Sequence, residues 1–86
     1  MKVTVASVLF EYTGGRHEVV GEGETLGDLL ADLDRRFPGM SFRIVDEQGR
    51  LRPHMNLFVS GRPTRDLRKR IAAGDEIHIL QALSGG

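Results

Sequence analysis

Residues 25–39, TLGDLLADLDRRFPG, decide the fold that the sequence predicts. Thr25 stands where a helix N-cap is expected, and Asp28, three residues on, is the acid of a capping box. Apolar side chains recur at helical spacing until Pro38-Gly39 stops the run, which predicts a helix over residues 25–37. Its apolar face carries Leu26, Leu29, Leu30, Leu33 and Phe37. The charged side chains are expected elsewhere on the helix: Asp32, Asp34, Arg35 and Arg36. Gly27 costs this helix about 1 kcal/mol relative to alanine, so we expect a close packing contact there.

Two strands are predicted before the helix. Residues 2–10, KVTVASVLF, begin with period-two alternation and are rich in β-branched types, and Val3 and Val5 are expected to face the core. Thr13-Gly14-Gly15 then supplies residues that tolerate positive φ, and residues 16–20, RHEVV, resume strand character. The sequence therefore predicts a β-hairpin at the N-terminus.

A loop and a third strand are predicted after the helix. Residues 40–53 lose clear periodicity and carry several turn-forming residues, which indicates a loop with at most a short extended piece over residues 42–45. Residues 55–59, MNLFV, have the composition of a strong strand. Residues 60–63, SGRP, are predicted to close it as a turn.

The last part of the chain is predicted to return to the sheet. Residues 66–71 are expected to form a single helical turn, residues 74–75 a second turn, and residues 76–80, EIHIL, the last strand. A right-handed crossover through the main helix would set the last strands beside the first. The predicted fold is α+β, a mixed four- or five-stranded sheet with one main helix packed across it.

Composition indicates one small domain. The chain has 86 residues and a formal net charge of zero, a length that supports a single core. It has no cysteine, so neither a disulfide framework nor a thiolate metal site is available. Its start alternates polar and apolar residues, and no stretch approaches the ~20 apolar residues that cross a bilayer. We therefore expect a cytoplasmic protein with no membrane partner.

The glycine-rich stretch before the helix is predicted to be a loop and cap. Residues 21–27, GEGETLG, lie between a strand and a helix, where a dinucleotide-binding fingerprint would sit. The glycine spacing is one residue too long, and Glu22 and Glu24 would repel a pyrophosphate. A nucleotide site is not expected here.

The histidines and the basic residues carry no recognisable catalytic or metal site. The histidines are scattered, without metal-ligand spacing or a nucleophile setting: His17, His54 and His78. A basic cluster lacks the interleaved aromatic residues of single-strand binders: Arg62, Arg65, Arg68, Lys69 and Arg70. We expect the histidines to be surface or structural. The cluster is expected to be a solvated face or a docking patch for an acidic partner, with no nucleic-acid partner and no metal.

Strand alternation predicts an apolar patch on the open face of the sheet. If Leu57 and Val59 point inward, Phe58 points out, and if the two isoleucines of residues 76–80 point inward, His78 and Leu80 point out. Large apolar side chains on neighbouring strands of an open sheet face mark a partner surface. Phe58 and Leu80 are therefore predicted to bind a partner.

The chain ends on residues 82–86, ALSGG, directly after the last strand. The residues lack periodicity, and two glycines have free φ and ψ, so we expect a folded domain over residues 1–81 and a flexible tail over residues 82–86. A slim glycine-glycine end can thread a narrow active site and present its terminal carboxylate there. This makes the carboxylate of Gly86 the candidate functional group.

These features together resemble the ubiquitin-like β-grasp sulfur carriers. That group includes the small subunit of molybdopterin synthase, the thiamine-pathway carrier and the carrier of thiocarboxylate-dependent cysteine synthesis. The most specific matches are residues 74–76, GDE, and residues 83–86, LSGG, and TLGDL at residues 25–29 is also typical. Chain length, the loop over residues 40–54 and the segment over residues 51–59 look most like the cysteine-synthesis carrier.

The resemblance implies that the function resides on Gly86. A partner enzyme would use ATP to adenylate the Gly86 carboxylate, and a sulfur donor would replace AMP to leave a thiocarboxylate. Gly85 and Ser84 would give clearance in the partner's active site. Leu80 and Leu83 would contact the partner.

The chain is thus predicted to be a protein substrate of its partners and not an enzyme. It would bind no cofactor itself, and its partners would be an adenylating sulfurtransferase enzyme and a sulfur-accepting synthase. The resemblance leaves three alternatives open. They are the molybdopterin synthase small subunit, a ubiquitin-like modifier joined to lysines through Gly86, and a plain β-grasp interaction module.

Overall fold

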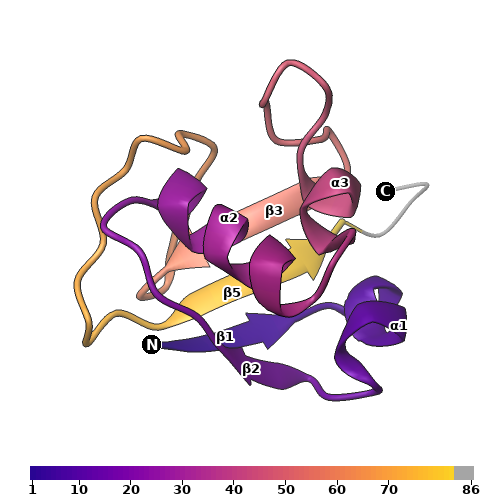
Figure 1. Ribbon diagram of the computed structural model, residues 1–86. Helices are drawn as coiled ribbons and strands as arrows, with labels where there is room; N and C mark the ends of the chain where they lie inside the picture. The colour runs from indigo at the N-terminus through magenta and orange to yellow at the C-terminus, as the bar shows by residue number, and fades with distance from the viewer. Residues whose placement is uncertain (83–86) are drawn as a thin grey trace.

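A five-stranded mixed sheet with one main helix across a single face forms the protein in the computed structural model, which describes residues 1–82 (Figure 1). The strand order is β2-β1-β5-β3-β4, with β1 and β5 parallel and the other pairs antiparallel. In chain order the elements are β1 (Lys2–Val5), η1 (Ser7–Leu9), α1 (Phe10–Thr13), β2 (Glu18–Val20), α2 (Leu26–Arg36), α3 (Met40–Ile44), β3 (Met55–Val59), β4 (Arg62–Thr64) and β5 (Ile77–Gln81). The predicted fold class is confirmed. No helix among residues 1–82 is long and apolar enough to span a bilayer.

Helix α2 begins and ends where the sequence predicts. The Asp28 backbone N–H donates to Thr25 Oγ1 at 3.1 Å, which is the expected N-cap. The four leucines of α2 are buried against the sheet. Gly27 donates its N–H to the Leu67 carbonyl at 2.8 Å, and a β-carbon at Gly27 would lie 3.2 Å from that oxygen. The expected close contact at Gly27 is confirmed.

The N-terminal prediction is right about pairing and wrong about the connection. Strands β1 and β2 pair antiparallel, with Lys2 opposite Val20. The first strand ends at Val5, however, and residues 7–13 form η1 and α1 instead of continuing it. The helical turns bury Leu9 completely, and Gly14, at φ 69°, ends α1 in the left-handed conformation. A continued strand would carry the Leu9 side chain away from the core.

Residues 40–44 form a helix, α3, and not the loop with an extended piece that was predicted. Met40 and Ile44 lie one helical turn apart and are both fully buried, whereas Phe42 between them is exposed. Helix α3 packs beside α2. Tertiary burial of Met40 and Ile44 therefore stabilises a helix that the weak local pattern of this short stretch does not predict.

Two corrections concern the segment between β3 and β5. The turn is only Ser60-Gly61, both at positive φ, and Arg62–Thr64 form the edge strand β4. Residues 66–71 form a turn closed by a hydrogen bond from Lys69 N–H to the Asp66 carbonyl at 3.1 Å, not a helical turn. The carbonyls of Leu67 and Lys69 accept instead from the first N–H groups of α2. The segment is thus held by α2 and not by hydrogen bonds of its own helix.

Candidate functional site

The alternation predicted for β3 and β5 is confirmed. In β3 and β5 the side chains that face α2 are buried: Met55, Leu57, Val59, Ile77 and Ile79. Phe58 and His78 are half-buried cross-strand neighbours on the other face, and Leu80 there is 36% exposed. Leu80 is opposite Asn56 in the register. The sheet therefore carries large apolar side chains on its open face, as the sequence indicates.

Phe58 and Leu80 line one shallow hollow. The hollow has a volume of about 280 Å³, and its lining residues are Phe58, Gly61, Glu76, His78 and Leu80. The β3–β4 turn forms one of its walls, because Gly61 lies in that turn. Side chains that are far apart in sequence are thus brought together as a candidate docking surface, which we call the open-face hollow.

A polar clamp holds the turn beside this hollow. Ser60 donates its hydroxyl to Asp75 Oδ1 at 2.8 Å, and the Ala72 N–H donates to Asp75 Oδ2 at 2.8 Å. The Ala72 N–H bond, followed by the Ser60 bond, lowers the pKa of the Asp75 carboxyl. The backbone N–H of Ser60 also reaches the Glu76 carbonyl at 2.8 Å. The GDE segment therefore has a structural task in fixing the start of β5.

Strand β5 ends at the edge of the domain, directly before Ala82. Gln81 pairs with Met55, and the Ala82 N–H donates to the His54 carbonyl at 2.8 Å, so the chain stays in register up to Ala82. Four predicted site residues lie outside the described residues: Leu83, Ser84, Gly85 and Gly86. Their predicted roles stay predictions. The same holds for the proposed boundary between the domain and the tail.

The start of α2 has no free donors for a phosphate. Leu26 N–H and Gly27 N–H donate to the carbonyls of Lys69 and Leu67, and the Asp28 N–H donates to Thr25. Because a helix N-terminus binds anions through these N–H groups, the geometry agrees with the loop-and-cap interpretation. Within residues 1–82 no group of three metal-ligating side chains gathers.

The predicted basic cluster divides into one structural arginine and several exposed cations. Arg65 donates from Nη1 to the Met55 carbonyl and from Nη2 to the Arg52 carbonyl, each at 2.8 Å, and also to the Leu51 carbonyl at 3.2 Å. The guanidinium therefore joins the end of the loop to β3. Arg65 is itself exposed, as are the other members of the cluster: Arg62, Arg68, Lys69 and Arg70.

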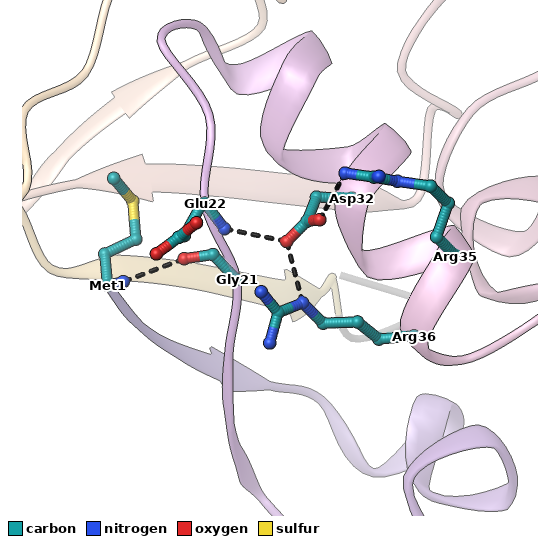
Figure 2. A network of polar contacts seen from close by, with 6 residues as sticks. All are labelled: Met1, Gly21, Glu22, Asp32, Arg35 and Arg36. Carbon is teal, nitrogen blue, oxygen red and sulfur yellow. Dashed lines mark hydrogen bonds and ion pairs between the residues drawn. The ribbon is translucent and has the colours of Figure 1, made fainter.

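Asp32 is a buried carboxylate that sequence reasoning placed off the apolar face of α2. Figure 2 shows that its Oδ2 accepts from the Glu22 N–H at 2.9 Å and from Arg36 Nε at 2.8 Å, while Arg35 donates to Oδ1. The Glu22 N–H is the main cause of the lowered pKa of Asp32, and Arg36 and Arg35 add to it. The Met1 ammonium donates to the Gly21 carbonyl at 2.8 Å in the same segment. The i, i+3 and i, i+4 spacing of Arg35 and Arg36 from Asp32 could have predicted the two ion pairs, but not the contact with the Glu22 N–H.

The sheet order and the crossing helix define a ubiquitin-like β-grasp protein. The model of the ThiS family matches residues 3–86, and the chain belongs to that family.

Relatives and solved structures agree with this membership. The sulfur carrier protein CysO of Mycobacterium tuberculosis is 35% identical, covering 98% of this chain and 96% of its own. The crystal structure of the Amycolatopsis orientalis BexX/CysO complex matches with a TM-score of 0.90 and 30% identity, covering 99% and 98% of the two chains. Small archaeal modifier protein 1 of Haloferax volcanii is 34% identical, covering 83% of this chain and 79% of its own. The crystal structure of SAMP1 from Haloferax volcanii matches with a TM-score of 0.77 and 32% identity, covering 100% and 98% of the two chains.

Proposed function

We propose that this chain is a sulfur carrier that bears its sulfur as a thiocarboxylate on Gly86. The observation that carries the proposal is the ThiS-family match, which extends through the terminal glycines to residue 86. The CysO relatives, named sulfur carrier proteins, are similar over nearly the whole length of both chains. The β5 strand, which leads to Ala82 at the domain edge, supports the same assignment.

The chemistry is activation of a carboxylate. The Gly86 carboxylate attacks the α-phosphorus of ATP on the partner enzyme, which forms an acyl-adenylate and releases pyrophosphate. A sulfide equivalent from a donor then attacks the acyl carbon, and AMP leaves with the bonding electron pair. Adenylation converts a poor acylating group into one with a good leaving group, the same logic as covalent catalysis. The chain itself is the reagent, and it uses ATP only through its partner.

The partners follow from the proposed chemistry. An adenylating enzyme loads the chain, and a synthase that accepts sulfur unloads it for the synthesis of cysteine or a related sulfur-containing metabolite. The open-face hollow, with Phe58 and Leu80, is the proposed contact surface for both. Support comes from the BexX/CysO complex, in which a similar chain is assembled with a second protein.

Protein modification is the second candidate function. The similarity to small archaeal modifier protein 1 is the observation that favours it. In that case the activated Gly86 carboxyl would be captured by a lysine amine of another protein and form an isopeptide bond. The two functions share the adenylation step and differ in the nucleophile.

Intact-mass measurement tests the proposal. The full chain is incubated with the adenylating enzyme of its own organism, ATP and sulfide, and it should gain about 16 Da as one oxygen becomes sulfur. The chain without Gly86 is the matched control and should show no gain while keeping its thermal unfolding temperature. No gain by the wild-type chain would overturn the carrier function. A gain by the shortened chain would place the sulfur elsewhere.

A further inference from the structure

A second hollow lies where the chain leaves the sheet. It has a volume of about 430 Å³ and is lined by Phe42, Arg43, Glu47, Arg52 and His54. Phe42 is 61% exposed, more than any other large apolar side chain among residues 1–82. The His54 carbonyl accepts the Ala82 N–H at 2.8 Å, so the exit of the chain and this hollow share His54. We call these five lining residues the exit hollow.

Phe42 is presented by a helix that does not need it for packing. Helix α3 is held by Met40 and Ile44, both fully buried, and Phe42 lies on the opposite side of this short helix. Figure 1 shows α3 on the same side of the sheet as α2, next to the end of β5. The exposed ring therefore contributes little to the core. Exposed aromatic rings and arginines are enriched at protein–protein contacts.

Arg52 is fixed in place beside the ring. Its Cζ lies 4.8 Å from the centroid of the Phe42 ring, and its Nε donates to the Phe42 carbonyl at 2.8 Å. The backbone N–H of Arg52 donates to the Ile44 carbonyl at 2.9 Å, and its own carbonyl accepts from Arg65. Between residues 1 and 82, no carboxylate lies within 4.0 Å of the Arg52 guanidinium, although its charge helps to lower the pKa of the Asp46 carboxyl. Its remaining N–H groups are thus preorganised for an external acceptor.

The length of the remaining chain limits where a partner can sit. Four residues, 83–86, follow Ala82 in the sequence. Even fully extended, they span at most ~14 Å. An enzyme that takes Gly86 into its active site must therefore bring the entrance of that site to within this distance of Ala82, whose N–H is bonded to the carbonyl of His54 in the exit hollow.

We propose that the exit hollow is a second docking surface, which contacts the entrance rim of the adenylating enzyme that receives Gly86. The rim would place a carboxylate against Arg52 and an apolar side chain against the Phe42 ring. This inference rests on the proposed function and assigns a partner contact within it. Helix α3, which carries Phe42, lies on the same side of the sheet as α2, whereas Phe58 and Leu80 lie on the open side, so the enzyme would contact both faces of the domain.

Phe42→Ala and Val20→Ala form a matched pair for the test. Val20 is 57% exposed, close to the value for Phe42, but it lies at the other end of the sheet, opposite Lys2 on the edge strand β2. The loading assay is run at varied chain concentration with the adenylating enzyme, ATP and sulfide, and thermal unfolding checks that both variants are folded. Phe42→Ala should raise the KM for the chain about fivefold or more with kcat unchanged, the effect of losing a central contact. Val20→Ala should leave KM within about twofold.

Amide hydrogen exchange gives a second readout that is independent of turnover. In the complex of the wild-type chain with the enzyme, amides at residues 42–44 and 52–54 should become protected, and amides of β2 should not. An unchanged KM for Phe42→Ala, or no protection of these residues in the complex, would overturn the exit-hollow assignment while the sulfur gain still stands. If the wild-type chain gains no sulfur, the proposed function itself is overturned, and the inference with it.

Discussion

Gly23→Ala will destabilise the domain through a backbone collision. A β-carbon at Gly23 would lie 2.5 Å from the Leu29 nitrogen and 2.9 Å from the Asp28 carbonyl carbon, and real β-carbons essentially never approach other atoms closer than 3.0 Å. Both atoms belong to the backbone of α2. No side-chain rotation relieves the contact, so α2 or the β2–α2 segment has to move. That movement disturbs the packing of the buried leucines of α2 against the sheet.

The size of the effect follows from the cost of overpacking. Forced backbone shifts of this kind cost about 1–3 kcal/mol. In a domain of this size each 1 kcal/mol lowers Tm by about 4–8 °C, so we expect Gly23→Ala to unfold at least about 4 °C below the wild type. Gly74→Ala is the matched control, because a β-carbon there meets no atom within 4 Å. Its free energy of unfolding should rise by about 0.4–1 kcal/mol, since alanine lowers the conformational entropy of the unfolded chain. Urea and thermal unfolding measure both variants. Equal stability of Gly23→Ala and wild type would refute this reasoning about the start of α2.

Three further predictions test the described residues. Leu80→Asp should lower the free energy of unfolding by less than about 2 kcal/mol, because Leu80 is already 36% exposed, and it should weaken binding of the adenylating enzyme. Ile79→Ala, at a fully buried site, is the control and should lower it by about 2–5 kcal/mol. Comparable urea midpoints for the two variants would show that Leu80 is part of the core. Arg65→Met should cost about 1–3 kcal/mol through the loss of three hydrogen bonds to carbonyls, and an unchanged midpoint would contradict the structural role assigned to Arg65. The lowered folded-state pKa of Asp32 means that its stabilisation is present above the unfolded-chain pKa and lost as pH falls through the folded-state pKa, so Asp32→Asn should destabilise more at about pH 7 than at about pH 3. An equal loss at both pH values would argue against an ionised Asp32.

The sequence predicts correctly those elements in which buried side chains recur at one regular spacing. The α2 cap at Thr25 and the alternation of β3 and β5 could be read directly, because each residue's neighbours within the element decide which way it faces. Phe58 and Leu80 were found for the same reason. The two side chains lie on the same open face because β3 pairs with β5.

The missed features depend on distant residues. The short helix α3 forms because Met40 and Ile44 find places in the core, and five residues hold too little periodicity to show this. Asp32 looked like an outer-face residue, and only the approach of the Glu22 N–H makes it a buried acceptor. Arg65 read as one member of a basic cluster, but its acceptors lie 10 to 14 positions away in the sequence.

Fragmentation of the loaded, intact chain in the mass spectrometer tests the central claim most directly. The wild-type chain is treated with the adenylating enzyme, ATP and sulfide, and C-terminal fragments are compared with those of the untreated chain. The sulfur-for-oxygen gain of about 16 Da should appear in every fragment that contains Gly86 and in none that lacks it. A gain on fragments without Gly86, or Gly86 recovered only in isopeptide linkage to lysine, would contradict the carrier function.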